Sequence, residues 1–189
     1  MKYGNLTLGQ IEAGINKIGG EEAFMRLLRD GLLISEVIVK KLLEFVRTVS
    51  LAAVDKFVAA EKFRLGKTID GIKVGWLSDN FKAGFLSKIE EQTPALEIRE
   101  HELLKNSRDP AIITELGGEE KVEITLGQFW EFLKTADRRF WYVAYIRDTK
   151  DVLWAVNAHW LSDGLYVEAH SIDDPNEWML AIGSSLADS

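Results

Sequence analysis

Two of the three histidines in this chain lie, together with a glutamate, in one stretch where polar and apolar residues alternate. His159, Glu168 and His170 could bind a divalent metal ion, because imidazole and carboxylate groups are common metal ligands. They could equally supply a general acid or base. On a solvated sheet face the same residues would only form cross-strand polar pairs, each worth about 0.2–1 kcal/mol. We therefore weigh three interpretations, a solvated face first, then a binding surface, then a metal or catalytic site.

A three-stranded antiparallel meander over Phe140–Ile172 must position these side chains. Three runs rich in β-branched and aromatic residues are separated by DTKD and SDG, which is typical of strands joined by tight turns. Successive side chains of a strand point to opposite faces. The apolar positions are even in the second strand and odd in the third, so only a turn of even length keeps them on one face. Asp163-Gly164 is a favoured pair for such a turn.

This register predicts which residues share the polar face of the meander. It places His159 opposite Glu168 and Asn157 opposite His170, in pairs whose side chains approach closely. The predicted binding residues on this face are Tyr142, Asn157, His159, Tyr166, Glu168 and His170.

The opposite face of the meander is predicted to lie in the core. A four-residue connection over Asp148–Asp151 extends the alternation from the second strand to the first. The large residues assigned to the apolar face in this way are Trp141, Val143, Tyr145, Trp154 and Trp160.

The rest of the chain predicts an α+β fold that begins with a helical hairpin over residues 1–34. Thr7-Leu8-Gly9-Gln10 is a capping box, in which the threonine and glutamine side chains bond each other's backbone N–H. The helix that follows ends at Gly19-Gly20, because glycine adopts the left-handed cap conformation without strain. A second helix over Glu21–Arg29 completes the hairpin, which packs on its own chain or on a partner. Thr125–Gln128 repeats the four capping residues and predicts the same cap.

Mixed strands and helices, followed by the meander, are predicted for a second domain over residues 35–189. Alternating apolar residues predict strands near 43–51, 72–76, 96–103 and 178–182. Ser78 is a predicted N-cap for a helix that ends near Glu91. Val54–Val58 indicates a short helix, and Asp109-Pro110 begins another, because proline suits the first helical turn.

Composition limits the classes of function open to this chain. Its 189 residues carry a formal net charge of −7 and include no cysteine. The acidic balance disfavours a broad surface for phosphate groups, and the lack of cysteine excludes disulfide scaffolds, zinc ribbons and thiol catalysis. The sequence shows no apolar stretch of signal-peptide type or of membrane-spanning length. We therefore expect a soluble cytoplasmic protein without metal, cofactor or membrane contact.

Motifs for other chemistry are weak or missing. Arg138-Arg139 precedes Phe140-Trp141-Tyr142, and basic residues beside aromatic ones are typical of single-stranded nucleic-acid platforms. The same residues fit a helix C-terminus followed by a core strand, so a nucleic-acid partner is the less expected interpretation. The glycine pairs lack the GxxxxGK[ST] and GxGxxG spacing of phosphate loops, and the sequence contains no GxSxG or HExxH motif.

Six sequence segments, spread over nearly the whole chain, together resemble a known group of proteins. They are LGQIEAGINKIGGEEAFMRLL, FVAAEKF, GWLSDNFKAGFLSKIEE, ITELGGE, YIRDTKDVLWAVNAHW and HSIDDPNEW. In these phrases the chain resembles an uncharacterised group of small soluble proteins encoded in genomes of uncultured bacteria. The resemblance implies no activity, ligand or catalytic residue.

Three hypotheses of function follow from these patterns. We expect a non-enzymatic cytoplasmic protein that acts by binding or interaction, with a protein as the candidate partner. The second hypothesis is a small hydrolase whose site lies on the polar face of the meander, and the third is a nucleic-acid-associated protein. A pocket that converges on His159 and Glu168 would favour the hydrolase, a basic stripe the nucleic-acid protein, and a shallow apolar patch the interaction protein.

Overall fold

The computed structural model describes residues 7–17, 20–22, 24–25, 41–179 and 182–187. The contacts within the chain divide it into two compact units, Met1–Lys40 and Lys41–Ser189.

In the first unit, α1 (Leu8–Lys17) begins at the predicted capping box. The backbone N–H of Gln10 donates to the Thr7 hydroxyl oxygen at 3.3 Å, and the Thr7 N–H donates to Gln10 Oε1 at 2.9 Å. Gly20 has a φ of 85°, the left-handed conformation expected where a helix ends at glycine. Residues 20–22 and 24–25 are helical, and the rest of the helix predicted over Glu21–Arg29 lies outside the described residues.

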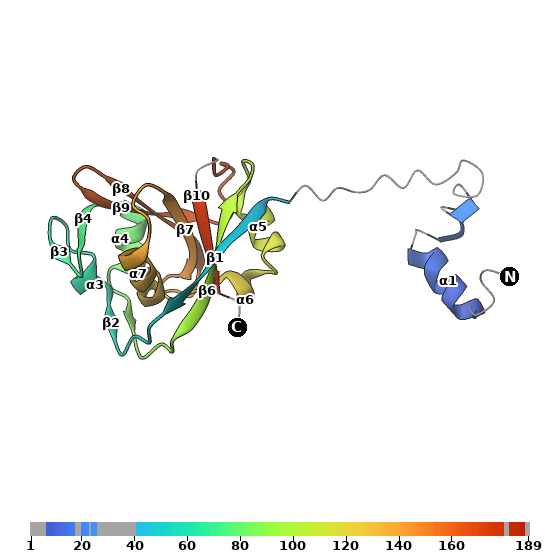
Figure 1. The fold of residues 1–189 in the computed structure, drawn as a ribbon, viewed down its shortest axis with the longest axis horizontal. Coiled ribbons are helices and arrows are strands. Elements are labelled where there is room, and N and C mark those ends of the chain that lie inside the picture. The colour runs from blue at the N-terminus through green and yellow to red at the C-terminus, as the bar shows by residue number, and fades with distance from the viewer. Residues whose placement is uncertain (1–6, 18–19, 23, 26–40, 180–181, 188–189) are drawn as a thin grey trace. The chain divides into compact units, whose positions relative to one another are not determined.

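The second unit is α+β and is built on a mixed sheet of eight strands (Figure 1). In order across the sheet these are β1 (Leu43–Leu51), β6 (Leu96–Leu103), β10 (Ile182–Ala187), β7 (Trp141–Arg147), β8 (Leu153–Leu161), β9 (Gly164–Ser171), β4 (Ile72–Leu77) and β3 (Thr68–Ile69). The neighbours β10 and β7 are parallel, as are β9 and β4, and the other neighbours are antiparallel. A separate pair joins β2 (Phe57–Val58) to β5 (Ile89–Glu90). The predicted antiparallel meander is therefore confirmed as β7, β8 and β9.

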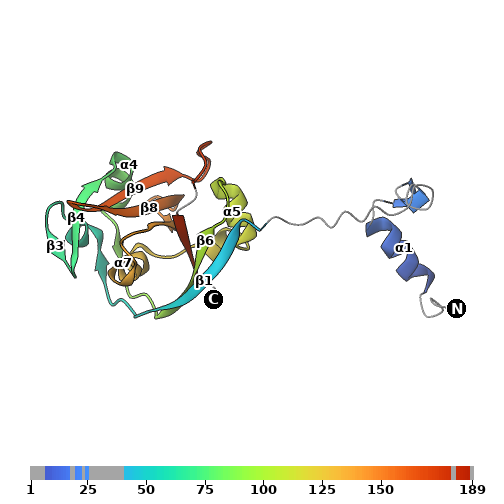
Figure 2. The same cartoon turned by 45° about the horizontal axis from the view of Figure 1, so that its top comes forward.

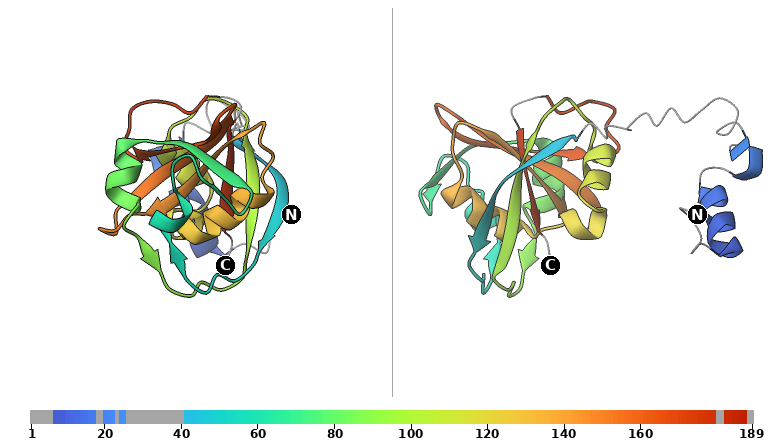
Figure 3. Two further views of the ribbon diagram at one scale, coloured as in Figure 1. Left: turned by 90° about the vertical axis from the view of Figure 1, so that its left-hand side faces the viewer. Right: turned by 45° about the vertical axis from the view of Figure 1, so that its right-hand side comes forward.

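Helices pack on both faces of the meander and create two hydrophobic clusters. The main cluster includes residues of α3 (Ala59–Lys62), α4 (Asp79–Phe85) and α7 (Leu126–Thr135), and the sheet curves around α7 (Figures 2 and 3). The second cluster includes residues of α5 (Asp109–Glu115) and α6 (Glu119–Val122). None of the described helices is both long and apolar enough to cross a membrane.

The local signals for helix starts are confirmed in this unit. Thr125 and Gln128 form the second capping box, and the Ser78 hydroxyl oxygen accepts the backbone N–H of Phe81 at 3.2 Å. The predicted helix ends were less accurate. The helix after Ser78 stops at Phe85 rather than near Glu91, and residues 57–58 are a strand rather than part of a helix.

Glu90, which the sequence predicts to lie near the end of this helix, serves another element instead. Its side chain is almost fully buried, and its carboxylate accepts the backbone N–H groups of Leu126 and Gly127 at 2.9 and 2.7 Å. These are donors at the N-terminus of α7, which have no partner within the helix. Glu90 lies in β5, where it pairs with Phe57 of β2, and from this strand its carboxylate reaches backbone groups of α7 that are 36 and 37 positions away in the sequence.

The predicted turn between β8 and β9 is wrong by one residue, which shifts the pairing of the two strands by two residues, although its even length is right. Leu161 pairs with Gly164, so the turn residues are Ser162 and Asp163. His159 consequently lies opposite Tyr166 and Asn157 opposite Glu168. Because the length of the turn is even, His159 and Glu168 still share one face of the sheet.

The predicted register between β7 and β8 is wrong by one residue, which reverses the faces of β7. Arg147 pairs with Leu153, so the connection has five residues, 148–152, rather than four. The Asp148 carboxylate holds this loop by accepting the N–H groups of Lys150 and Val152 at 2.8 and 3.0 Å, and Asp151 has a φ of 63°. A shift of one residue moves every side chain of a strand to the other face.

This correction moves Tyr142 away from the predicted binding face. Its side chain is buried in the main cluster, and its hydroxyl donates to the backbone oxygen of Asp137 at 3.0 Å. Val143 and Tyr145 instead lie in the second cluster. The residues Trp154 and Trp160, predicted to be core, are half-buried and pack against the main cluster from its margin.

Gly164 is required for the approach of two strands rather than for the turn. It has a φ of 146°, and a Cβ atom built there would lie 2.4 Å from the backbone oxygen of Lys73 in β4. A side chain at this position would therefore force β9 and β4 apart, in addition to the strain of the positive φ.

We predict that Gly164→Ala lowers the free energy of unfolding by about 2–4 kcal/mol, since φ strain and a backbone clash act together. Gly118→Ala is the matched control, because Gly118 has a φ of 103° but nothing within 4 Å of its Cβ position. Urea denaturation of both variants measures the difference. A cost for Gly164→Ala no larger than that for Gly118→Ala would contradict the close approach of β9 to β4.

Candidate functional site

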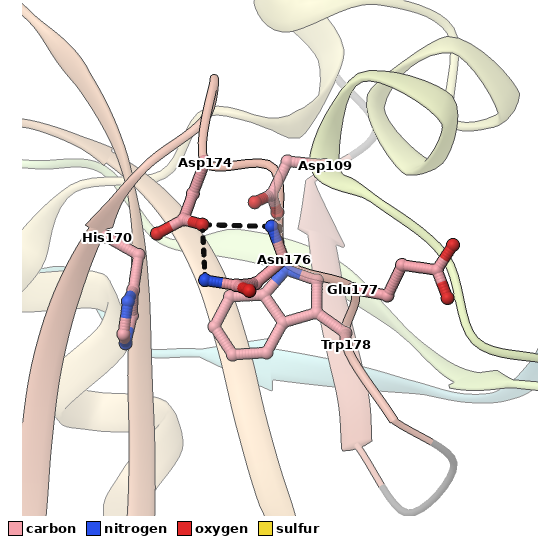
Figure 4. Close-up of a pocket in the computed structure, with 6 residues that line it drawn as sticks. All are labelled: Asp109, His170, Asp174, Asn176, Glu177 and Trp178. Atoms are coloured by element: carbon pink, nitrogen blue, oxygen red, sulfur yellow. Dashed lines mark hydrogen bonds between the residues drawn. The ribbon is translucent and has the colours of Figure 1, made fainter.

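A small pocket lies at the C-terminal end of β9, between the start of α5 and the segment that follows the meander (Figure 4). Its volume is about 100 Å³, and the residues that line it are Asp109, His170, Asp174, Asn176, Glu177 and Trp178. Three of these six are carboxylates and none is lysine or arginine. A bulk water molecule occupies about 30 Å³, so the pocket has room for a small head group.

Asp109 is the buried carboxylate of this pocket. It is the first residue of α5 and precedes the helix proline, and only 2% of its surface is exposed. Its Oδ1 accepts two hydrogen bonds, from the Tyr145 hydroxyl and from the Trp178 indole N–H, both at 2.7 Å. Burial raises the pKa of the Asp109 carboxyl, because loss of water disfavours the charged form, and the two hydrogen bonds offset this only in part.

His170 connects the pocket to the polar face of the meander. It lies two residues after Glu168 on β9, so both side chains point to the same side of the sheet. His170 Nε2 is 2.9 Å from Glu168 Oε2, and the imidazole ring lies edge-on to Trp178 with 5.4 Å between ring centroids. The glutamate therefore orients the imidazole beside the tryptophan wall of the pocket.

The segment after β9 is held in place by its own hydrogen bonds. Asp174 Oδ1 accepts from both the backbone N–H and the side-chain amide of Asn176, at 2.9 and 2.7 Å (Figure 4). Trp178 and Ser107 exchange two backbone hydrogen bonds of 2.8 and 3.2 Å. These bonds, with the one from the Trp178 indole N–H to Asp109, hold Trp178 at the wall of the pocket.

The structure brings five of the six predicted binding residues to one face, while Tyr142 lies on the other. Only His170 among them lines the pocket, and Glu168 reaches it through His170. The expectation of a solvated face is wrong at Asn157 and His159, which are 1% and 5% exposed. Burial lowers the pKa of His159, with the charge of Glu168 acting in the opposite direction.

A row of aromatic rings crosses this face on four neighbouring strands. Trp141 stacks on His159 with 3.8 Å between ring centroids, and His159 is followed by Tyr166 at 5.5 Å. Trp76 stacks on Tyr166 at 5.8 Å and continues the row into β4. The buried imidazole of His159 is thus covered by aromatic neighbours and does not belong to the pocket.

Sequence reasoning missed Asp109, Asp174, Asn176, Glu177 and Trp178. Asp109-Pro110 indicates a helix start, and this local explanation gives no indication that the carboxylate is buried. A tryptophan in the otherwise polar phrase DDPNEW was the one sign that this tail folds back on the domain. In the part of the chain that the structure describes, no three histidine or acidic side chains are grouped so that they could hold a metal ion.

We predict that Asp109→Ala lowers the free energy of unfolding by about 2–5 kcal/mol, because it leaves the buried hydroxyl of Tyr145 and the indole N–H of Trp178 without an acceptor. Asp109→Asn retains an acceptor oxygen and is expected to cost less than half as much. Urea denaturation of the two variants gives the comparison. Equal losses for alanine and asparagine would show that the two hydrogen bonds do not stabilise the domain.

The chain has no match among the protein-family models, the curated proteins or the solved structures compared with it. The resemblance to an uncharacterised bacterial group therefore stays a prediction, and function is inferred from the chain's own residues.

Proposed function

We propose that this protein is a non-enzymatic binding protein whose pocket at Asp109 takes a cationic head group. The observation that carries the proposal is the lining of the pocket, in which Asp109, Asp174 and Glu177 surround a tryptophan wall and no lysine or arginine occurs among the described lining residues. An ammonium or guanidinium group is attracted both by carboxylates and by the face of an aromatic ring.

Burial of Asp109 gives the cation a specific advantage. An isolated carboxylate in a dry site is unfavourable, which is why the pKa of Asp109 is raised. A cation that enters the pocket stabilises the charged form, so the ligand and the ionised carboxylate favour each other. Neutral molecules of the same shape lack this electrostatic attraction to the carboxylate, and the pocket therefore discriminates by charge.

The size of the pocket indicates how the cation is presented. A volume of about 100 Å³ is below the roughly 300–1,000 Å³ typical of sites that enclose a whole small molecule. The pocket suits the end of a chain, such as an alkylamine or the side chain of lysine or arginine on a partner protein. This agrees with the expected role in binding or interaction.

A hydrolase is the second candidate, and the pair of His170 and Glu168 favours it. A histidine oriented by a carboxylate can act as a general base, and an aspartic acid with a raised pKa can donate a proton in the same pocket. Among the described residues that line the pocket there is no serine, threonine or lysine, so this chemistry would use water as the nucleophile. This candidate requires turnover of a bound ester or amide, whereas the binding function does not.

We predict that n-butylammonium and n-butylguanidinium bind and that n-butanol, the neutral analogue, does not. Isothermal titration calorimetry measures the three affinities. Glu177→Gln should weaken the binding of both cations about two- to fivefold, since Glu177 is exposed, and Asp109→Asn about tenfold or more. Both affinities should fall as the pH is lowered, because protonation of Asp109 removes its charge.

Glu61→Gln is the matched control, because Glu61 is an exposed acid on α3 that does not line the pocket. It should leave the cation affinities unchanged. Equal binding of n-butanol and the cations, or equal losses for Glu61→Gln and Glu177→Gln, would contradict a cation site at this pocket.

A further inference from the structure

A second and larger hollow lies at the opposite end of β9, where the turn between β8 and β9 meets the β3–β4 hairpin. Its volume is about 540 Å³, within the range typical of small-molecule sites. Residues from three separate parts of the chain line this groove, and those with polar side-chain groups are Thr68, Lys73, Arg138, Trp160, Ser162 and Asp163.

The polar groups of the groove are mainly hydrogen-bond donors. Lys73 and Arg138 bring two positive charges, and the hydroxyls of Thr68 and Ser162 add neutral donors. Arg138 Nη2 donates to the backbone oxygen of Gly71 at 2.9 Å, which orients the guanidinium. A guanidinium has five N–H donors, and this is the bond that Arg138 makes to the described residues. A local excess of positive charge contrasts with the net charge of −7 of the whole chain.

Trp160 supplies a donor that no described residue of the protein uses. Its indole N–H is buried, and no hydrogen-bond partner for it occurs among the described residues. Buried donors in folded proteins are nearly always paired, and each exception requires a reason. Trp160 also lines the groove, so an acceptor atom of a bound molecule would lie close to the tryptophan side chain.

Asp163 is the one acidic side chain among the described residues that line the groove. Its Oδ2 already accepts the hydroxyl of Tyr166 at 3.0 Å, and this bond raises the pKa of Tyr166. With Asp163 included, the described lining residues carry two positive charges and one negative charge. The charge and the donors together favour an anion with several acceptor oxygens.

We propose that this groove binds a small molecule that bears a phosphate group. A phosphate presents three terminal oxygens and up to two negative charges, which matches two cations and three neutral donors better than a single carboxylate does. Arginine is suited to phosphate because its planar fork makes two parallel hydrogen bonds. The exposed side chain of Leu161, together with the indole of Trp160, offers an apolar wall for the rest of the molecule.

The chemistry of this groove is independent of the pocket at Asp109. The two hollows lie at opposite ends of β9, have opposite charge and share none of their described lining residues. Arg138 belongs to the basic and aromatic stretch that suggested nucleic acid from the sequence. Its neighbour Arg139 is paired with Asp137 through Nη2 at 2.6 Å, so only Arg138 of the two lines the groove.

Isothermal titration calorimetry with inorganic phosphate and with phenyl phosphate tests this site. Lys73→Met is expected to weaken binding at least about tenfold, because it removes a charge-assisted hydrogen bond, and Trp160→Phe about threefold or more through loss of the indole N–H. Lys82→Met is the matched control, since Lys82 lies on α4 and pairs with Asp79 rather than lining the groove. Far-ultraviolet circular dichroism and thermal melts verify that each variant is folded.

Binding of either probe, weakened by Lys73→Met and by Trp160→Phe but not by Lys82→Met, supports the proposal. Tighter binding of phenyl phosphate identifies an ester as the ligand, and equal or tighter binding of inorganic phosphate identifies the free ion. Absence of binding for both probes at millimolar concentration overturns the proposal. It is also overturned if Lys73→Met binds as well as the unmodified protein, or if Lys82→Met weakens binding equally.

Discussion

The carboxylate of Asp109 joins parts of the chain that are far apart in the sequence. It accepts the hydroxyl of Tyr145, 36 residues away on β7, and the indole N–H of Trp178, 69 residues away beyond the meander. A buried carboxylate is tolerated only where donors satisfy it, so these two bonds and the start of α5 must form together. The position of the tail, the wall of the pocket and the raised pKa of Asp109 all depend on this arrangement.

Features decided by neighbouring residues could be predicted from the sequence. Both copies of TLGQ form capping boxes, Ser78 caps its helix and Leu43–Leu51 is a strand, because each signal needs only a few adjacent residues. Loop lengths were not predictable in the same way. Asp148 accepts two backbone N–H groups and allows a five-residue connection, and that single extra residue reverses every side chain of β7. Tyr142 was assigned to the wrong face for this reason alone.

The candidate site was predictable only where it follows strand alternation. Glu168 and His170 share a face because they are two residues apart on one strand, and this holds in any register. Asp109 and Trp178 reach the same pocket from other segments, and a contact of this kind depends on the packing of α5 against the sheet. Gly164 illustrates the same limit, because its position is set by the backbone of Lys73 on a strand more than ninety residues earlier and not by its own turn.

The pKa of the Asp109 carboxyl, measured by carbon-13 NMR with and without saturating n-butylammonium, tests most directly whether the pocket is a cation site. Without ligand, burial should hold this pKa above the ordinary value of about 3.9, so the carboxyl titrates at higher pH than an exposed aspartate. With the cation bound, the charged form is stabilised and the pKa should fall. A pKa at or below the ordinary value without ligand, or one that the cation leaves unchanged, would contradict the proposed site.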